Sequence, residues 1–531
     1  MDKATQPVTP GQGSPRLGRD VRTVAAIVVC GAITTVLDTT IVSVAIDRLG
    51  SQFGGPVSQV QWVMTAYLLA LSAVIPLTGW AADRYGGKRV WMVSLCLFAV
   101  GSLLCGLAWS LESLIVFRVL QGLGGGMVAP VGMTLVAQAA GPQRMGRAMS
   151  MVGIPMMLGP VIGPVLGGVL ISAVSWRWIF LLNLPIAALT IAWSARALTN
   201  TRRSGRERLD LAGLLLLSPG LAALTFGVWA VSQPGGLARA DAAVGILGGL
   251  AMLAAFAVHA VRRRAALLDL RHFAHRTFAA AASIQFLMGA VLVGAMLLLP
   301  LYCQVARGES AWVTGLQLMP LGIGAALAMW VTGRYVDRGF GKAVVCTGIP
   351  MLAAGFVAYT QGGPGTAPTV LALSLLVIGL GTGCLMAPVS AAAYSVLDRA
   401  AIPRATATLN ITQRVGGTLG TAAYAVVLQH HLAQVGADAG TTSLTAAFAQ
   451  TFWWPLVVAA LALAPALLLP GRRSGPAPAA QTPRTSQPRR HSPPDDHHQG
   501  HPKSRQKNTE GEKPHDRPVR RARPGATLGH G

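Results

Sequence analysis

The decapeptide GWAADRYGGK at residues 79–88 returns as GRYVDRGFGK at residues 333–342. The two copies share a first Gly, an Asp-Arg pair, a later Gly and a final Lys at matching positions. Each copy lies in a short charged gap between two long apolar runs. The repeat therefore indicates a duplicated chain, and the flanking apolar runs indicate that the duplicated unit is a set of membrane-spanning helices.

Composition also favours a membrane protein. Of the 531 residues, 52% are hydrophobic and only 12% are charged, and the mean hydropathy is +0.51. The charged residues gather between apolar stretches of about 20 residues, the length at which an α-helix crosses a bilayer. Continuous stretches such as LLLLSPGLAALTFGVWAV, at residues 214–231, lack the polar–apolar alternation of a membrane barrel. We therefore predict an all-α integral membrane protein.

The apolar stretches predict fourteen membrane-spanning helices. They lie at residues 23–46, 60–82, 89–108, 113–137, 148–172, 175–195, 211–231, 243–261, 278–303, 311–333, 343–360, 367–396, 405–428 and 452–470. The first decapeptide then follows the second helix and the second decapeptide follows the tenth. A simple duplication of six helices would bring the copies closer together, so we infer that two helices have been added between the halves.

The offset of eight helices between the two decapeptides predicts the domain organisation. Residues 23–198 are expected to form an N-terminal six-helix bundle, 209–262 two inserted linker helices, and 277–470 a C-terminal six-helix bundle. A cytoplasmic segment at 1–22 precedes them. The tail at 471–531 is basic, rich in Pro and Gln and nearly devoid of aliphatic residues, so we predict that it is disordered. Its DDHHQGH stretch at 495–501 could bind a divalent metal, but a solvated tail is the interpretation we favour.

The distribution of Lys and Arg predicts the orientation. With a cytoplasmic N-terminus, 37 of the 43 basic residues lie inside, four lie outside and two, Arg118 and Arg414, lie within helices. Because basic residues are enriched in cytoplasmic loops, both termini are predicted to be cytoplasmic. These loops and the tail explain the net charge of +24 through contact with the lipid bilayer, so no nucleic acid is expected as a partner.

Five short motifs follow one another along the N-terminal bundle. They are LDTTIVSVAI (37–46), GWAADRYGGKR (79–89), FRVLQGLGGG (117–126), GPVIGPVLGG (159–168) and WRWIFLLNLP (176–185). In this order they resemble motifs of the fourteen-helix drug:proton antiporter branch of the major facilitator superfamily. The resemblance covers residues 23–470. It implies the major facilitator fold with fourteen transmembrane helices (6 + 2 + 6), and a multidrug or antibiotic efflux transporter in the bacterial plasma membrane.

Asp38 and Arg118 are the candidate proton-coupling residues. Asp38 is the one carboxylate well inside an apolar run, where an ionised acid costs about 2.5–3.5 kcal/mol by insertion scales. The rise of an α-helix places Asp38 and Arg118 at nearly the same depth in helices one and four. We expect them to face one cavity, with protonation of Asp38 releasing the pair, and the resemblance implies the same roles. The alternative is a buried ion pair that only fixes the two helices.

Four polar residues are candidates for the substrate cavity. Gln121 lies one turn from Arg118 and could bond the ion pair, a neighbouring helix or a substrate. Arg414 lies near the membrane midplane with Asn410 and Gln413 close by. A buried cation must face a cavity or a partner. Arg414 is therefore expected either to meet an anionic or carbonyl-bearing substrate, or to stabilise packing through backbone carbonyls.

Helix five carries a motif with a glycine at every fourth position, which forms a smooth stripe for the close approach of another helix. Prolines interrupt its hydrogen bonds and should bend it. The resemblance implies a pliable, leak-tight interface between the halves that is associated with export, whereas tight packing without control of direction is the alternative. The motif comprises Gly159, Pro160, Gly163, Pro164, Gly167 and Gly168.

The repeated loops are expected to control access from the cytoplasmic side. Asp83 and Asp337 can accept hydrogen bonds from helix N-termini, or pair with arginine across the boundary between the halves. For the basic residues we favour a role in membrane orientation alone. The second copy has Gly339 and Phe340 where the first has Tyr85 and Gly86. The expected gating set is Gly79, Asp83, Arg84, Gly87, Arg89, Asp337 and Arg338.

The energy source is predicted to be the proton gradient, without a cofactor, because the sequence contains no G-x-x-x-x-G-K-[ST] phosphate loop. The six cysteines are scattered with no metal-ligand spacing, so no metal site is expected among them.

We therefore predict a monomeric, proton-coupled exporter of amphipathic organic compounds such as drugs or antibiotics. One buried carboxylate could not readily bind a divalent cation and also carry a proton, so monovalent cationic, neutral or anionic substrates are expected. A gradient-driven importer of the same fold is the alternative. An integral membrane enzyme would need a cluster of acidic or histidine residues at a membrane face, which the sequence outside the tail does not contain.

Overall fold

The structure is a computed structural model that describes residues 18–54, 57–141, 144–199, 209–231, 236, 239–263, 267–398, 401–435 and 440–471. All regular structure in these ranges is helical. The predicted cytoplasmic segment at 1–22 falls mostly outside the described residues. The predicted disordered tail at 471–531 falls outside them except for residue 471, and so does the metal-binding stretch considered at 495–501.

The first half contains six long helical segments. They are α1 (Arg19–Val44), α4 (Trp62–Tyr85), α5 (Gly87–Gly106), α6 (Leu111–Ala140), α7 (Met145–Ala173) and α9 (Asn183–Ala197). The short helices α2 (Ile46–Phe53), α3 (Val57–Val60) and α8 (Trp178–Leu181) lie between them. The N-cap Ser110 begins α6 with a capping box, in which its side chain accepts a hydrogen bond from the backbone N–H of Ser113.

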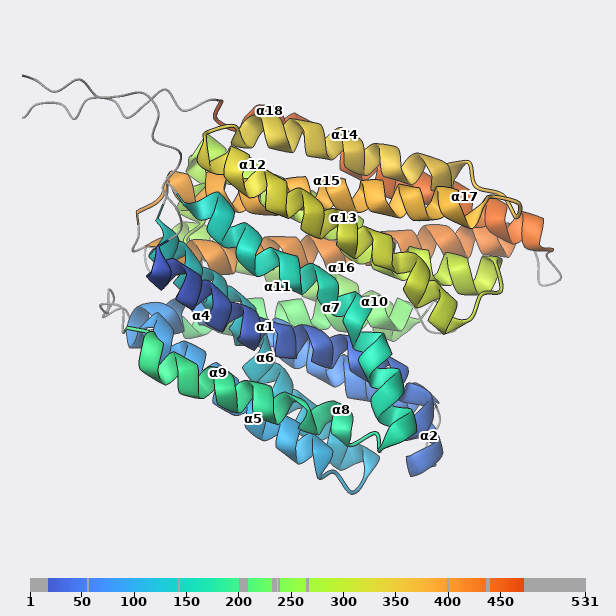
Figure 1. The fold of residues 1–531 in the computed structure, drawn as a ribbon, viewed down its shortest axis with the longest axis horizontal. Coiled ribbons are helices and arrows are strands. Elements are labelled where there is room, and N and C mark those ends of the chain that lie inside the picture. Colours follow the sequence, from blue (N-terminus) through green and yellow to red (C-terminus); the bar gives the residue numbers. More distant parts are fainter. Residues whose placement is uncertain are drawn as a thin grey trace, which may run out of the picture. The chain divides into compact units, whose positions relative to one another are not determined.

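The two helices that the sequence predicts as an insertion are α10 (Leu211–Val231) and α11 (Ala240–Arg262), and we call them the inserted pair. The 3₁₀ turn η2 (Leu270–Ala274) leads into the second half. That half contains α12 (Arg276–Leu301), η3 (Tyr302–Ala306), α13 (Ala311–Asp337), α14 (Gly341–Thr360), α15 (Pro368–Ser395), α16 (Ile402–Val435), α17 (Thr441–Leu461) and α18 (Leu463–Leu467). Figure 1 shows α1, α5, α6 and α9 on one side of the helical bundle, and α12, α14 and α15 on the other.

Twelve helical segments of the described chain are long and apolar enough to cross a membrane. The fourteen predicted segments all coincide with helices, but α7 and α16 are not among the twelve, although they contain 29 and 34 residues. The last predicted segment began too late, because its helix starts at Thr441 rather than at residue 452. The first turns of this helix are rich in Thr and Ser, which lower the hydropathy of the sequence. These hydroxyls can still be accommodated in a helix, because the hydroxyl of Thr445 donates to backbone carbonyls of the same helix.

Matched glycines show that the two halves pack alike. A Cβ built on Gly101 of α5 would lie 2.6 Å from the backbone of Gln121 on α6. A Cβ built on Gly355 of α14 would lie 2.8 Å from the backbone of Ile378 on α15. Gly101 and Gly355 occupy the same place in two 20-residue helices, each of which follows a copy of the decapeptide. Glycine permits this close approach because it has no side chain.

The inserted pair packs against one helix from each half. Leu217 of α10 and Phe256 of α11 belong to a buried apolar cluster that also contains Ile75 of α4 and Ile411 of α16. Burial of these side chains holds the pair beside the boundary between the halves.

A buried carboxylate fixes the base of the inserted pair. Asp210 accepts hydrogen bonds from the backbone N–H groups of Gly213 and Leu267 and lies 3.0 Å from Nε2 of His259. Burial raises the pKa of Asp210, but the hydrogen bonds from Gly213 and His259 outweigh it, so the pKa lies below its usual value. Asp210 therefore remains ionised at neutral pH and joins the start of α10 to the end of α11.

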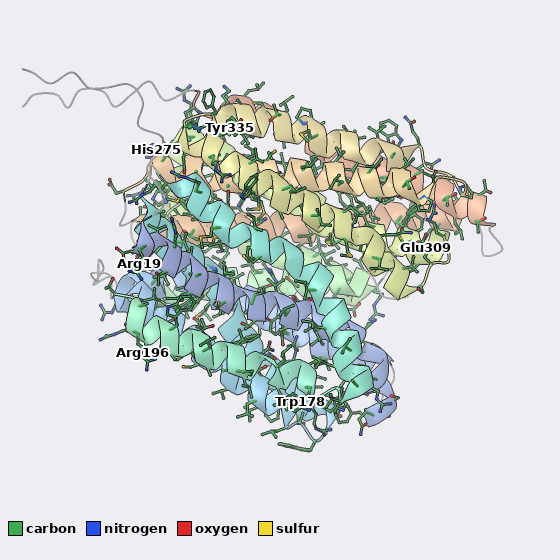
Figure 2. All side chains as sticks on the ribbon, viewed as in Figure 1. Arg19, Trp178, Arg196, His275, Glu309 and Tyr335 are labelled. Carbon is green, nitrogen blue, oxygen red and sulfur yellow. The ribbon has the colours of Figure 1, made fainter. Side chains whose placement is uncertain are left out.

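The two ends of the helical bundle differ in their residues. Figure 2 shows Arg19, Arg196, His275 and Tyr335 at one end, and Trp178 and Glu309 at the other. We call the first the repeat end, because Tyr335 belongs to the second decapeptide and the first decapeptide lies at the same end.

Candidate functional site

The first half contains a buried network centred on a carboxylate. Nη1 of Arg118 on α6 lies 2.6 Å from Oδ2 of Asp38 on α1, in a salt bridge. The same nitrogen donates to Oε1 of Gln121 at 2.8 Å, and Nε2 of Gln121 donates to Oδ1 of Asp38 at 2.8 Å. The contact predicted from helix depth between Asp38 and Arg118 is therefore present, and Gln121 joins the pair.

Two further residues complete the network. Nδ2 of Asn183, the first residue of α9, donates to Oδ1 of Asp38 at 3.2 Å and to Oγ of Ser102 on α5 at 3.0 Å. Oγ of Ser102 also accepts from Gln121 at 3.0 Å. Asn183 lies in the motif at residues 176–185, but the sequence indicated no role for it, and no sequence signal singled out Ser102. The network thus joins α1, α5, α6 and α9 around one carboxylate.

The network is closed to solvent. Asp38 and Gln121 are 0% exposed and Arg118 is 1% exposed. The Arg118 guanidinium lies 4.0 Å from the ring centroid of Tyr67, and its Nε donates to the carbonyl of Val63 at 3.0 Å. The expectation that Asp38 and Arg118 face a cavity is therefore not met in this conformation, nor is a place for Gln121 in the substrate cavity. Their hydrogen-bonding groups are instead turned toward one another.

A cavity of about 540 Å³ lies between α4, α10, α12 and α16. Three of the predicted substrate residues line it: Asn410, Gln413 and Arg414 of α16. Sequence reasoning missed the contribution of α10, which supplies Thr225, Val228 and Trp229. The apolar run of α10 gave no sign of which face would meet a cavity.

Arg414 is held by the helix that faces it across the boundary between the halves. Its Nε donates to Oγ of Ser72 on α4 at 2.9 Å. Asn410 and Gln413 also line a smaller cavity of about 120 Å³, whose other walls include methionines of α6, α7, α13 and α15. Residues of α16 therefore line two cavities, one walled in part by α10 and one by methionines of both halves.

At the repeat end, the first decapeptide forms an ion pair between the halves. Asp83 at the end of α4 lies 2.9 Å from Nε of Arg404 near the start of α16. A Cβ on Gly79 would lie 3.2 Å from the backbone of Arg404, so the glycine allows α4 and α16 to approach closely.

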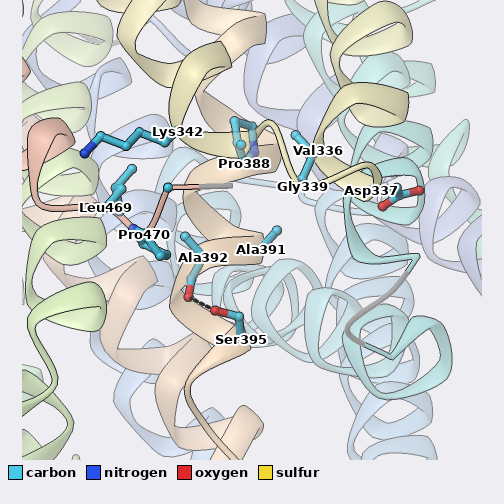
Figure 3. Close-up of a pocket in the computed structure, with 12 residues that line it drawn as sticks. Val336, Asp337, Gly339, Lys342, Pro388, Ala391, Ala392, Ser395, Leu469 and Pro470 are labelled. Atoms are coloured by element: carbon cyan, nitrogen blue, oxygen red, sulfur yellow. Dashed lines mark hydrogen bonds between the residues drawn. The ribbon is translucent and has the colours of Figure 1, made fainter. Parts of the chain in front are cut away.

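The second decapeptide forms the matching contact with α7. Asp337 pairs with Nε of Arg147 and also accepts the backbone N–H of Gly146 at 2.9 Å. Figure 3 shows Asp337 and Lys342 pointing away from each other on either side of the loop that contains Gly339. The small pocket there, of about 80 Å³, is below the size of a drug-binding cavity. Each repeated aspartate thus meets an arginine of the other half.

The other members of the gating set take no part in these pairs. Arg84, Arg89 and Arg338 are exposed, and Gly87 is the first residue of α5. The repeated lysines instead bind within their own half. Nζ of Lys88 donates to the carbonyls of Ala195 and Leu198 at the end of α9, and Nζ of Lys342 donates to the carbonyl of Leu467 at the end of α18.

The glycine stripe of α7 packs within the first half. A Cβ on Gly167 would lie 3.0 Å from Ile41 of α1, and the nearest atoms to Gly159 and Gly163 belong to Val36 and Thr40 of the same helix. This differs from the interface between halves that the resemblance implied for these glycines. A glycine stripe predicts close approach but not which helix approaches. A Cβ on Gly168 would contact nothing within 4 Å, and the side chains of Pro160 and Pro164 lie outside the described part.

Among the described residues, no group of three or more His, Cys, Asp or Glu side chains could hold a metal ion. The arrangement instead offers a buried titratable carboxylate, a cavity between the halves and two ion pairs at the repeat end.

Comparison with known proteins assigns the family. The family model of the Major Facilitator Superfamily matches residues 28–421. A Multidrug resistance protein B homolog of Mycobacterium tuberculosis strain H37Rv is 41% identical over 457 residues, covering 83% of this chain and 84% of that protein. Multidrug resistance protein 3 of Bacillus subtilis strain 168 is 27% identical over 401 residues, covering 75% of this chain and 77% of that protein.

The fold agrees with this assignment. The crystal structure of the human organic anion transporter MFSD10 (TETRAN) aligns with a TM-score of 0.57, covering 83% of this chain and 99% of that chain. Its sequence identity of 17% means that the likeness concerns the fold alone. This multi-pass membrane protein belongs to the Major Facilitator Superfamily, a family of transporters.

Proposed function

We propose that the protein is a proton-coupled antiporter that exports amphipathic organic molecules across the bacterial plasma membrane, as a monomer and without a cofactor. The observation that carries the proposal is the carboxylate of Asp38, which is buried in the first half and bound by Arg118, Gln121 and Asn183. An ionisable group at this depth is expensive and marks a proton or substrate pathway in membrane proteins.

Protonation of Asp38 would supply the coupling. The ionised carboxylate accepts two hydrogen bonds at Oδ1 and the salt bridge of Arg118 at Oδ2. A proton on Oδ2 removes the negative charge and replaces an acceptor with a donor that faces the N–H of Arg118. The pair then loses its attraction, and α1 and α6 are released from each other at this point. Deprotonation restores the pair.

The two Asp–Arg pairs at the repeat end would act as the gate. Asp83 with Arg404 and Asp337 with Arg147 both connect the halves, so both must break before the halves can separate at that end. The repeat end carries the basic loops, and the positive-inside rule assigns it to the cytoplasm together with both termini. With α7 and α16 counted as spans, the bundle has fourteen.

Export of drug-like molecules is supported by the relatives and by the cavity. The Mycobacterium tuberculosis and Bacillus subtilis relatives are both named multidrug resistance proteins. The cavity of about 540 Å³ lies within the range of about 300–1,000 Å³ that holds drug-sized ligands. Its lining combines apolar side chains with threonines and Arg414, which suits an amphipathic molecule.

The test is Asp38→Asn in proteoliposomes, with drug uptake driven by an imposed pH gradient that is acidic inside. Asn keeps the size and shape of the side chain but cannot carry the proton, so gradient-driven uptake should fall to the level of empty liposomes. Asp241→Asn is the matched control, because the side chain of Asp241 on α11 is 38% exposed and forms an ion pair with Arg239. Gradient-driven uptake that survives Asp38→Asn, with normal insertion of the variant, would refute the coupling role.

A further inference from the structure

Arg414 brings a positive charge to the cavity without a carboxylate to balance it. Its Nε is bound to Ser72, but among the described residues neither Nη1 nor Nη2 has a hydrogen-bond or ion-pair partner. No Asp or Glu occurs in the described lining of the cavity. Asp38 is not an alternative partner, because it is 0% exposed and its oxygens are bound by Arg118, Gln121 and Asn183.

A guanidinium in this position favours an anion. A cation held inside a membrane protein without a counter-charge is costly, so it marks a site where a ligand can supply the missing charge. The planar fork of the two terminal nitrogens matches the two oxygens of a carboxylate, sulfonate or phosphate. Thr65 and Thr418, which also line the cavity, donate their hydroxyl hydrogens to the carbonyls of Gln61 and Arg414, so the charged contact with the ligand is left to the guanidinium.

Another part of the lining is apolar and partly aromatic. The α10 residues Val228 and Trp229 face the cavity with Leu297 of α12. The ring of Trp229 lies 5.2 Å from that of Trp62 and 5.5 Å from that of Phe226, which fixes its orientation. A rigid aromatic surface of this kind binds the flat hydrocarbon body of a ligand.

We propose that the substrates are amphipathic organic anions, with the acidic group on Arg414 and the apolar body against Trp229. This assignment rests on the proposed exporter function and names the substrate class of the same cavity. It gives the inserted pair a direct part in substrate binding, because α10 supplies the apolar wall. Cationic substrates, by contrast, would be repelled by Arg414, and the described lining of the cavity contains no Asp or Glu to offset the repulsion.

The charge of the substrate sets the electrical behaviour of the transport cycle. If one proton enters as one monovalent anion leaves, two positive charge equivalents move inward per cycle, so an inside-negative membrane potential drives export. Exchange of one proton for one monovalent cation would instead move no net charge. The anion assignment therefore predicts that export responds to membrane potential as well as to the pH gradient.

The binding test uses two dyes that share one body. Anilinonaphthalene sulfonate carries an anionic group, and phenylnaphthylamine is its uncharged counterpart. In phosphatidylcholine nanodiscs, the wild type should bind the sulfonate roughly ten- to hundredfold more tightly than the neutral dye, because a charge-assisted pair replaces an unfilled guanidinium. Arg414→Gln should remove this preference, and Arg239→Gln, an exposed change on the inserted pair, should keep it.

Two variants keep the test informative if Arg414→Gln fails to fold. Arg414→Lys retains the charge but loses the fork, and should bind the sulfonate several-fold more weakly than the wild type does. Trp229→Ala should weaken both dyes equally and leave their ratio unchanged. Equal affinity of the wild type for the two dyes, or a preference for the cation ethidium, would overturn the proposal. Loss of sulfonate binding in phosphatidylglycerol nanodiscs would also overturn it, because the anion at Arg414 would then be a lipid headgroup.

Flux measurements separate this proposal from the exporter function. Wild-type transport of ethidium but not of the sulfonate under a pH gradient would refute the anion assignment and leave proton-coupled export standing. Potential-stimulated sulfonate transport that persists in Asp38→Asn would refute proton coupling and support the anion site.

Discussion

The two halves of the molecule pack their helices alike but fill the same positions with opposite chemistry. In the first half Gly101 brings α5 against Gln121 of α6, and in the second Gly355 brings α14 against Ile378 of α15. Counted from the start of each helix, Ser102 corresponds to Phe356, Arg118 to Leu375 and Gln121 to Ile378. The first member of each pair is polar or charged, and the second is apolar.

In the second half, the apolar residues at these positions belong to a packed hydrophobic core. Phe356 and Tyr359 of α14 pack against Phe452 of α17, with ring centroids 6.5 Å and 4.9 Å from it. Leu375 and Ile378 are 1% and 0% exposed. The second half therefore buries the corresponding helix interface with apolar side chains alone. The ion pair of the first half is not needed to hold such helices together, which favours a functional role over a purely structural one.

Removing one charge from the first half should have the largest effect. Arg118→Leu copies the residue of the second half but leaves the carboxylate of Asp38 buried without its counter-charge. We expect a loss of about 3–5 kcal/mol in the free energy of unfolding, measured by denaturation in detergent. The mirror change Leu375→Met, which alters an apolar side chain in the second half, should cost less than about 1.5 kcal/mol.

Removing both charges tests whether the instability of Arg118→Leu comes from the unpaired carboxylate of Asp38. The double variant Asp38→Leu/Arg118→Leu should recover most of the stability lost in Arg118→Leu, because no unpaired charge remains. It should still show no transport driven by a pH gradient. A double variant as unstable as Arg118→Leu would mean that the first half depends on the polar network for its packing, unlike the second half.

The Asp–Arg pairs should show where the halves behave alike. Asp83→Asn and Asp337→Asn each remove one charge-assisted contact at the repeat end, a change of roughly 1.5–3 kcal/mol. Each variant should raise the population open at the repeat end by about tenfold or more, since 1.4 kcal/mol corresponds to a factor of ten. Distances between spin labels at the exposed positions 89 and 334 would report the opening.

The matched controls are Arg84→Gln and Arg338→Gln, which neutralise exposed residues of the same loops. They should leave the label distances at wild-type values. Opening in only one of the two aspartate variants would show that the two copies have diverged in function despite their matching contacts.

The sequence predicted the parts of this arrangement that depend on chemistry along one helix. Each apolar stretch predicted from the sequence coincides with a helix, and helix depth predicted the contact between Asp38 and Arg118. The sequence could not identify Ser102 as part of the network, because the hydroxyl of a lone serine in an apolar helix most often donates to a backbone carbonyl of the same helix. The sequence predicts that the repeated aspartates either accept hydrogen bonds from helix N-termini or pair with an arginine across the halves, but it does not indicate Arg404 and Arg147 among the many basic residues.

Contacts that depend on how distant helices meet were not predictable in this way. The glycine stripe of α7 predicted that another helix packs closely against it. In the structure that helix is α1 of the same half, not a helix of the other half. The wall that α10 contributes to the cavity depends on the docking of the inserted pair against α4 and α16, which hydropathy does not specify.

The repeated lysines should give the smallest effect and the closest agreement between the halves. Lys88 and Lys342 bind carbonyls at the ends of α9 and α18, where a cation is favoured by the helix dipole. Lys88→Met and Lys342→Met keep most of the aliphatic stem, so each should lower the free energy of unfolding by about 0.3–1 kcal/mol without changing proton-driven transport. Loss of transport in either variant, with stability unchanged, would place that lysine in the gate rather than in the packing of its own half. The whole repeated decapeptide would then have a gating role. If transport is unchanged, its two repeated residues have separate functions: the aspartate connects the two halves, and the lysine stabilises helix packing within its own half.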